Sequence, residues 1–246
     1  MALSEAVVQL QTKAGPMQAL LYLPASAETG GKVPGVVVVQ EAFGVNTAIQ
    51  EACRKLAVAG YAAIAPELFH RSAAPGAVFP YDFAVVGPHF AKLTNDGIAE
   101  DLGVARDFLA AHPRVRRDRL GVIGFCVGGF AAYLGACRLE LAAAVVCYGG
   151  GLVHQRPQFA LQPVLDETPR SPVLGLFGAK DASIPPADVE AIRARLARAG
   201  PGHEVVVYPD AGHAFLNQER PQNHHAPSAA LGWEKILAFL GSKLGA

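Results

Sequence analysis

Hydrophobic residues in this chain gather in short continuous runs, and between the runs they return at helical spacing. Continuous runs predict strands buried on both faces, as in a parallel sheet, and they cover residues 36–39, 61–65, 120–125, 143–148, 173–177 and 204–208. Apolar residues three and four apart predict helices, which cover residues 47–58, 96–111, 127–137, 187–199 and 229–240. Residues 6–12 and 17–23 predict an N-terminal hairpin with its turn at 14–16.

This order of elements predicts an α/β fold. Strands that alternate with helices form a mostly parallel central sheet with helices on both faces. Residues 69–93 follow neither period and contain several proline, glycine and aromatic residues. A loop of this length in a compact domain is usually functional, so we expect an irregular segment that serves as a lid.

Length and charge limit the kinds of partner. A chain of 246 residues, 51% of them hydrophobic, can bury one large core, and we expect a single α/β domain over residues 1–246. The formal net charge is +0, from 21 basic and 21 acidic residues. Without a positive excess, nucleic acid and acidic membrane surfaces are not expected as partners. We expect a small-molecule substrate that is selected inside a pocket.

The N-terminus and the cysteines indicate a compartment. The N-terminus carries Glu5 and no basic segment, so no secretory signal is expected. The four cysteines include no C-x-x-C pair, which predicts reduced thiols in a cytoplasmic protein. No glutamate or cysteine stands at metal-ligand spacing from a histidine, so we expect neither a metal nor another cofactor.

One hexapeptide carries the clearest chemistry. Residues 124–129 read Gly-Phe-Cys-Val-Gly-Gly and join a predicted strand to a predicted helix. This is the G-x-Nuc-x-G nucleophile elbow, with Cys126 as the nucleophile. Side chains at Gly124 or Gly128 are expected to clash with neighbouring backbone. The N-terminus of the helix would stabilise a thiolate and an oxyanion. The alternative is a glycine-rich turn around an inert buried cysteine.

An acid and a base follow this cysteine in the chain. Asp181 comes just after one predicted strand, and His213 comes shortly after the next. Functional groups in open α/β sheets lie beyond the carboxyl ends of the strands, so Cys126, Asp181 and His213 are expected to form a catalytic triad there. His213 would take the thiol proton, and Asp181 would orient the imidazole. Asp181 could instead only cap the next helix, and Asp188 is a weaker candidate for the acid.

Together these motifs resemble those of the dienelactone hydrolase family, from about residue 33 to residue 239. Besides the elbow, Asp181 and Gly-His-Ala-Phe at 212–215, the resemblance rests on Gln-Glu-Ala-Phe-Gly-Val-Asn at 40–46, Ala-Pro-Glu-Leu-Phe at 65–69 and Cys-Tyr-Gly-Gly-Gly at 147–151. It implies the α/β-hydrolase fold. It also implies a hydrolase that cleaves a small ester or lactone through a thioester acyl-enzyme.

The resemblance implies further roles around the triad. Glu41 matches the family's buried glutamate, which contacts the nucleophilic thiol in the resting enzyme, whereas its alternative is a solvated loop residue. The backbone N–H groups of Ala42 and Val127 match the oxyanion hole. Four residues are expected to line the substrate pocket, although the tyrosine at 148 could belong to the core: Phe43, Tyr81, Tyr148 and Asn217.

The chain departs from the family pattern where a substrate carboxylate would bind. Family members that open dienelactones carry one arginine shortly after the histidine motif and another in the lid. Here neutral Asn217 follows the motif, and residues 72–90 contain no lysine or arginine. A buried carboxylate needs a fixed cation, so the sequence predicts no strong preference for carboxylated substrates unless Arg71 or Arg220 reaches the pocket. The lid instead predicts an aromatic wall, formed by Phe79, Tyr81, Phe83 and Phe90.

Other functions fit the same residues. The protein could be a general small-molecule carboxylesterase or thioesterase, or a non-catalytic relative that binds small molecules. An intact set of nucleophile, acid and base argues against a binding-only protein. A redox thiol protein is disfavoured because no resolving cysteine lies near Cys126. The oligomeric state stays open, and a homo-oligomer is one possibility.

Overall fold

The computed structural model describes residues 3–28, 31–156 and 160–245 of the chain. Its strands form an eight-stranded sheet in the order β1-β2-β4-β3-β5-β6-β7-β8. The strands are β1 (Ser4–Thr12), β2 (Gly15–Leu23), β3 (Val33–Val39), β4 (Ala62–Pro66), β5 (Val115–Phe125), β6 (Ala143–Cys147), β7 (Val173–Gly178) and β8 (Glu204–Tyr208). The helices are α1 (Ala25–Glu28), α2 (Thr47–Val58), α3 (Phe83–Phe90), α4 (Asn95–Ala111), α5 (Val127–Arg138), α6 (Pro186–Ala199) and α7 (Ala226–Leu244).

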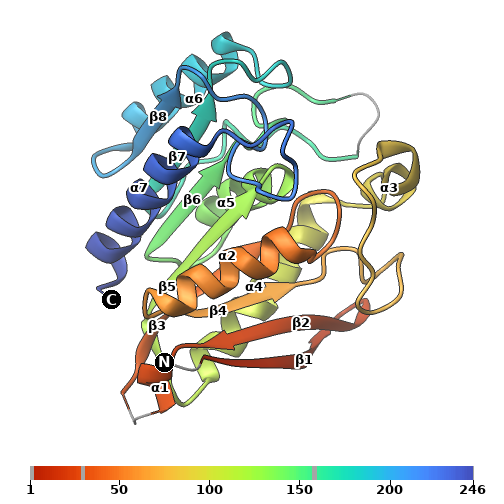
Figure 1. Cartoon of the computed structure of the whole chain (residues 1–246), viewed down its shortest axis with the longest axis vertical. Coiled ribbons are helices and arrows are strands. Elements are labelled where there is room, and N and C mark those ends of the chain that lie inside the picture. The colour runs from red at the N-terminus through yellow and green to blue at the C-terminus, as the bar shows by residue number, and fades with distance from the viewer. Residues whose placement is uncertain (1–2, 29–30, 157–159, 246) are drawn as a thin grey trace.

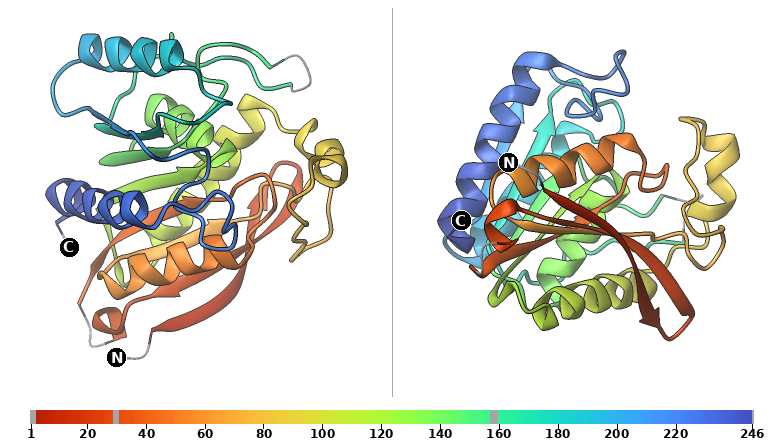
Figure 2. Two further views of the ribbon diagram at one scale, coloured as in Figure 1. Left: turned by 45° about the horizontal axis from the view of Figure 1, so that its top comes forward. Right: turned by 60° about the horizontal axis from the view of Figure 1, so that its bottom comes forward.

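The predicted fold class, with a mostly parallel sheet, is confirmed. The pairs from β4 through β3, β5, β6 and β7 to β8 are all parallel, and only β1 and β2 add antiparallel pairing at one edge. Strands β3, β4, β6 and β7 are buried along their whole length. This agrees with their continuous apolar runs. Helices α2 and α7 cover one face of the sheet, and α4 and α5 cover the other (Figures 1 and 2).

Local signals account for the helices that the sequence predicts. Helix α2 begins after Asn46, whose side chain accepts a hydrogen bond from the Ile49 N–H, as a good N-cap does. The helix buries one apolar stripe against the sheet and ends just before Gly60, which has a φ of 96°. Glycine tolerates this left-handed conformation, so the expected helix end at this position is confirmed.

Helix α3 corrects the expectation of a wholly irregular segment at 69–93. Gly87 and Pro88 indicate a break in the sequence pattern, and Pro88 has no N–H to continue the helix. The helix forms nevertheless because Asp82 caps its N-terminus through the Ala84 N–H and because Val86 and Phe90 are buried. Tertiary packing therefore outweighs local propensity here. Helix α3 projects beyond the carboxyl ends of the parallel strands (Figure 1).

The parallel strands bring five chain segments to one edge of the sheet. The loops that follow β3, β5, β6, β7 and β8 meet at this edge. Parallel strands all end on the same side, so groups far apart in the sequence become neighbours there. In the described part of the chain, no helix is long and apolar enough to cross a membrane. The same residues contain no group of three His, Cys, Asp or Glu side chains arranged to hold a metal ion.

Candidate active site

Cys126 lies at the tip of a strained turn between β5 and α5. Its φ is 57° and its ψ is −115°, a conformation that costs a non-glycine residue about 1–3 kcal/mol. A Cβ at Gly124 would lie 1.7 Å from the Gly128 carbonyl oxygen, and one at Gly128 would lie 2.4 Å from the Val39 carbonyl oxygen. Both glycines are therefore required by backbone contact, as the elbow pattern predicts.

The other non-glycine residues with positive φ in the described chain also lie at this edge. Tyr148 follows β6 with a φ of 41°, and Ala214 follows His213 with a φ of 60°. Backbone strain of this kind persists only where surrounding contacts enforce it, and it concentrates at functional sites. The strain thus marks the same segments as the sequence motifs.

His213 joins a carboxylate on one side and the sulfur on the other. Its Nδ1 lies 2.7 Å from Oδ2 of Asp181, and the Cys126 sulfur lines the same pocket and raises the pKa of the ring. Because Nδ1 is engaged with the carboxylate, Nε2 is the nitrogen left for sulfur. The structure therefore brings together the three residues that the sequence proposed as nucleophile, base and acid.

Neighbouring ionisable groups determine the direction in which the pKa of His213 shifts. Burial opposes the charged imidazolium, but the neighbouring Cys126 and Asp181 outweigh it and raise the pKa of His213 to about 10. For Asp181, burial again opposes the charged form, but hydrogen bonds from His213 and Ser183 outweigh it and lower the pKa of the carboxyl. The pair thus favours an ionised carboxylate beside a protonated ring.

Ser183 is a member of this cluster that the sequence analysis did not include. Its hydroxyl lies 2.6 Å from Oδ1 of Asp181 and 3.2 Å from Nδ1 of His213, and its N–H donates to the same carboxylate oxygen over 2.8 Å. Asp181 does not cap α6 with its side chain, since Pro185 holds the N-cap position. Asp188 lies inside α6, 3.5 Å from His154, and not at the site.

Glu41 is buried beside the site but makes different contacts from those expected. Its Oε1 accepts a hydrogen bond from the Tyr148 hydroxyl over 3.3 Å, and its Oε2 accepts one from the Asn217 amide over 2.8 Å. The alternative of a solvated loop residue is wrong, because Glu41 is only 2% exposed. The hydrogen bonds of Glu41 thus go to Tyr148 and Asn217, and not to the thiol as the resemblance implies.

The two backbone groups proposed for an oxyanion hole lie in the segments that follow two adjacent strands, β3 and β5. Val127 is the first residue of α5, so its N–H finds no partner within the helix. Ala42 is fully buried directly after Glu41, and β3 pairs with β5 up to Val39 and Gly124. Val127 follows Cys126 directly, and the pairing of β3 with β5 brings the segment of Ala42 to the same edge, as donors to an oxyanion would require.

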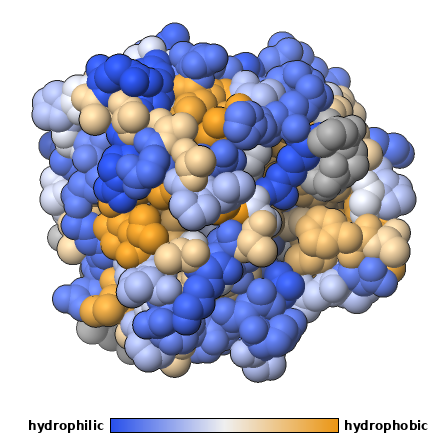
Figure 3. Space-filling view, turned by 90° about the horizontal axis from the view of Figure 1, so that it is seen from above, coloured by the Kyte–Doolittle hydropathy of each residue, from blue (hydrophilic) through white to orange (hydrophobic). Residues whose placement is uncertain are grey.

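A pocket opens over Cys126 and His213. Its other lining residues are Phe83, Phe90, Val127, Phe130, Gly150, Gly151, Arg156 and Leu161. Two of the aromatic lid residues named from the sequence, Phe83 and Phe90, do form its wall, and both belong to α3. Apolar side chains, among them the half-exposed Phe83 and Val85, interrupt the polar surface where α3 lies (Figure 3).

The four residues expected to line the substrate pocket do not line this one. Phe43 and Tyr81 pack edge to face, with ring centroids 4.8 Å apart, and Phe43 supports Phe83 from behind at 5.5 Å. Tyr148 and Asn217 line a separate cavity. A motif identifies a loop but not the direction of each side chain, so contact of these four residues with a substrate stays a prediction.

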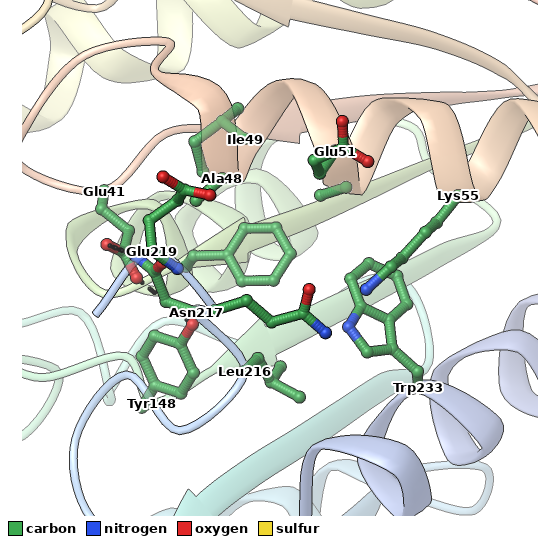
Figure 4. Close-up of a pocket in the computed structure, with 13 residues that line it drawn as sticks. Glu41, Ala48, Ile49, Glu51, Lys55, Tyr148, Leu216, Asn217, Glu219 and Trp233 are labelled. Atoms are coloured by element: carbon green, nitrogen blue, oxygen red, sulfur yellow. Dashed lines mark hydrogen bonds between the residues drawn. The ribbon is translucent and has the colours of Figure 1, made fainter. Parts of the chain in front are cut away.

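Figure 4 shows this separate cavity, with Glu41, Asn217 and Tyr148 at one end and Lys55 and Trp233 at the other. Helix α2 forms its upper wall with Ile49, Glu51 and Lys55. Cys126 and His213 are not among the residues that line it. Glu41 therefore belongs to a polar cluster that faces away from the pocket over the sulfur.

The arginines also differ from the expectation. Arg71 donates to both oxygens of Asp101, over 2.7 and 2.9 Å, and is held away from the pocket. Arg220 lies over the rings of Tyr81 and Phe43, at 5.1 and 5.7 Å. Arg156, which the sequence analysis did not consider, lines the pocket instead. The available signal was its position in the loop after β6, at the carboxyl edge of the sheet.

This fold and this site define the class of the protein. A strained nucleophile turn followed by a helix, with an acid and a histidine on the loops after two later strands, is the arrangement of an α/β hydrolase. The dienelactone hydrolase family model matches residues 17–244, and the chain belongs to that family. The resemblance and the enzyme class expected from the sequence, a hydrolase, are confirmed.

Individual relatives agree with the family. A protein assigned as a carboxymethylenebutenolidase in Salmonella typhimurium is 37% identical, over 99% of this chain and 90% of its own length. A Bradyrhizobium protein assigned as a 2-oxo-3-(5-oxofuran-2-ylidene)propanoate lactonase is 30% identical, over 90% of this chain and 88% of its own length. A crystal structure assigned as a dienelactone hydrolase from Klebsiella pneumoniae matches with a TM-score of 0.87 and 36% identity, covering 98% of this chain and 99% of that one.

Proposed function

We propose that this protein hydrolyses small esters or lactones through a thioester acyl-enzyme on Cys126, with His213 and Asp181 completing a catalytic triad. The observation that carries the proposal is the position of Cys126 and His213 at one apolar pocket, with His213 Nδ1 2.7 Å from Oδ2 of Asp181. A nucleophile, a base and an orienting acid in this order are what acyl transfer requires. The names of the relatives, which are lactone hydrolases, support the substrate class.

The chemistry follows from the positions of these groups. His213 holds the thiol proton while Sγ of Cys126 attacks the substrate carbonyl carbon, and the N–H groups of Ala42 and Val127 stabilise the resulting oxyanion. Collapse of the tetrahedral intermediate breaks the carbon–oxygen bond, and His213 gives the proton to the leaving oxygen. Water then attacks the thioester with His213 as base, which releases the acid and restores the thiol.

Glu41 has a separate role in this proposal. Burial raises the pKa of its carboxyl, and the hydrogen bonds from Asn217 and Tyr148 only partly oppose the change. We assign it as a positioning residue that holds Tyr148 behind the site. The edge-to-face contact of Tyr148 with the His213 ring, with centroids 5.3 Å apart, transmits that position to the base. We further propose a cytoplasmic location, supported by four free cysteines in the described chain.

The experiment compares wild type with Cys126→Ala on para-nitrophenyl acetate. We expect wild type to turn over and the variant to lose at least about a thousandfold in kcat, because the nucleophile is gone. Mass spectrometry of rapidly quenched wild type should find one acetyl group on the peptide that contains Cys126. Cys137→Ala is the matched control. Cys137 is buried near the end of α5, the helix that begins after Cys126, and its thiol donates a hydrogen bond to the Glu167 carbonyl.

Two results would contradict the proposal. Full turnover by a correctly folded Cys126→Ala would exclude the cysteine as nucleophile. A wild type that binds esters without cleaving any of them would indicate the non-catalytic alternative. Equal loss in the Cys137→Ala control would show that the effect comes from the fold and not from the chemistry.

A further inference from the structure

An open groove between two helices adjoins the cavity of Figure 4. Helices α2 and α7 lie side by side on one face of the sheet (Figures 1 and 2), and both contribute walls to the groove. The walls are largely apolar, with Val58 from α2 and with Ala230 and Leu237 from α7. Lys55 and Trp233 line both the groove and the inner cavity. These two residues therefore stand where the two spaces meet.

Polar groups that line this groove lack hydrogen-bond partners. Within the described residues, Nε1 of Trp233 and Nε2 of His224 are buried and make no hydrogen bond. Nζ of Lys55 lies over the Trp233 ring, 4.9 Å from its centroid, and burial lowers the pKa of this amine. An indole N–H can only donate, and leaving it buried without an acceptor is unfavourable. The groove therefore favours a ligand that supplies acceptors.

The acids nearest to Lys55 are engaged by an arginine. Glu51, one turn before Lys55 on α2, lies 2.6 Å from Nη1 of Arg54, and Glu5 lies 2.9 Å from Nε of the same side chain. In the part of the chain that the structure describes, no Asp or Glu oxygen lies within 4.0 Å of Lys55 Nζ. The further acids of the inner cavity do not line the groove, and they would repel an anion that moved inward. A negative group thus fits the groove beside Lys55 and not the inner cavity.

The side chain of Lys55 covers the position that such a group would take. Figure 4 shows the Lys55 amine beside the nitrogen of the Trp233 ring. A lysine ammonium sits on a flexible stem with rotatable donors, so it can turn outward with a ligand and uncover the indole N–H. A carboxylate accepts hydrogen bonds from both an ammonium and an indole.

We propose that the groove between α2 and α7 is a second binding site, separate from the pocket over Cys126, for a small monocarboxylate with an aliphatic chain. The carboxylate binds between Lys55 and Trp233. The chain lies along the apolar walls and covers Val58, which is 79% exposed, so apolar surface leaves water on binding. This site does not depend on the proposed ester hydrolysis.

The test uses the fluorescence of Trp233, which is the single tryptophan of the chain and therefore reports on this site directly. Titration of the wild-type protein with octanoate should change the Trp233 emission until the change saturates. Octanamide has the same chain length but no charge, so it should bind at least about tenfold more weakly. Equal affinity for octanoate and octanamide would contradict a carboxylate site.

Two variants test the groups that hold the carboxylate. Lys55→Met keeps an apolar stem but loses the charge, so octanoate should bind about 10- to 100-fold more weakly while octanamide binding hardly changes. Trp233→Phe removes the N–H and the fluorescence, so calorimetry measures its octanoate affinity, which should fall by about tenfold or less. Lys235→Met is the matched control, because Lys235 is also partly buried and lies on α7, but it already pairs with Glu204 and does not line the groove. Unchanged octanoate affinity in Lys55→Met, or an equal loss in Lys235→Met, would overturn the proposal.

A photoreactive ligand locates the site. A diazirine analogue of octanoate, crosslinked to the wild-type protein and mapped by mass spectrometry, should label peptides from α2 and α7. Labelling confined to α3 or α5, which line the pocket over Cys126, would place the carboxylate there and refute a second site. A Trp233 emission that depends on protein concentration and not on octanoate would identify a second copy of the chain as the occupant and would refute it equally. Ester cleavage enters none of these measurements, so they remain decisive even if the proposed function fails.

Discussion

Two buried carboxylates at the same edge of the sheet titrate in opposite directions. Asp181 follows β7 and is 5% exposed, and Glu41 follows β3 and is 2% exposed. Burial opposes ionisation of both. Yet the pKa of Asp181 is lowered, whereas the pKa of Glu41 is raised.

The charge of the direct partner explains the difference. Asp181 hydrogen-bonds an imidazole that becomes positive, and Ser183 adds two further hydrogen bonds to the same carboxylate. Glu41 is bonded only by a phenol and an amide, which are neutral donors. Neutral hydrogen bonds do not offset the desolvation of a buried charge, whereas a hydrogen-bonded cation does. The two buried acids therefore differ in their surroundings: Asp181 faces an imidazole that can carry charge, and Glu41 faces a phenol and an amide.

The largest expected effect comes from removing the charged partner. Asp181→Asn should lower kcat/KM for para-nitrophenyl acetate by about 10⁴-fold, because an amide favours the wrong imidazole tautomer. The double variant with His213→Ala should be little worse than His213→Ala alone, since the two residues act as one unit. Asp188→Asn is the matched control and should stay near wild type. Losses that multiply in the double variant would contradict the pairing of His213 with Asp181.

Replacing Glu41 with a neutral amide should have a much smaller effect. Glu41→Gln should cost less than about tenfold in kcat/KM, because the amide resembles the protonated acid and can keep both partners. It should also change the pH dependence of stability. A raised pKa means that the native state binds more protons than the unfolded chain above the ordinary value of 4.5. Within that window the wild type loses up to about 1.4 kcal/mol of unfolding free energy per pH unit as pH rises.

Urea denaturation of wild type and Glu41→Gln from about pH 5 to about pH 8 measures this difference, with each m-value checked for two-state behaviour. The unfolding free energy of the variant should lack the decline with rising pH that Glu41 causes in wild type. The sign is reversed for Asp181. Its lowered pKa contributes unfolding free energy that is fully present above the ordinary pKa of 3.8 and is lost as pH falls below that value. A Glu41→Gln curve parallel to that of wild type would show that Glu41 is ionised in the native protein and would remove the contrast.

The smallest expected effect concerns the hydrogen bonds that distinguish Asp181 from Glu41. Ser183→Ala removes the hydroxyl that lies 2.6 Å from Asp181 but keeps the backbone N–H and the His213 contact. We expect kcat/KM to fall about tenfold or less, corresponding to about 1.4 kcal/mol or less. Ser242→Ala, at a hydroxyl on α7 that bonds the Phe239 carbonyl, is the control. A loss as large as that of Asp181→Asn would instead make Ser183 part of the catalytic unit.

Much of this protein can be predicted from the sequence because the relevant interactions are local. Helix α2 has the predicted bounds because Asn46 and Gly60 bracket one amphipathic stretch. The elbow around Cys126 was predictable because its glycines are required by backbone contacts within a few residues and with the adjoining strand. The order of Cys126, Asp181 and His213 along the chain also indicated their meeting, since parallel strands end at one edge.

The lining of the pocket depended on tertiary structure alone. Helix α3 forms against its own proline because Phe83, Val86 and Phe90 find partners in distant segments. The partners of an arginine also depend on segments that are distant in the sequence. Arg71 pairs with Asp101 on α4, whereas Arg156 donates to the Ser183 carbonyl. Glu41 and Asp181 carry the same functional group and differ through partners that lie 176 and 32 residues away in the chain. A motif thus identifies the reactive groups, but the charge state and the direction of each side chain are decided only when the loops meet at the edge of the sheet.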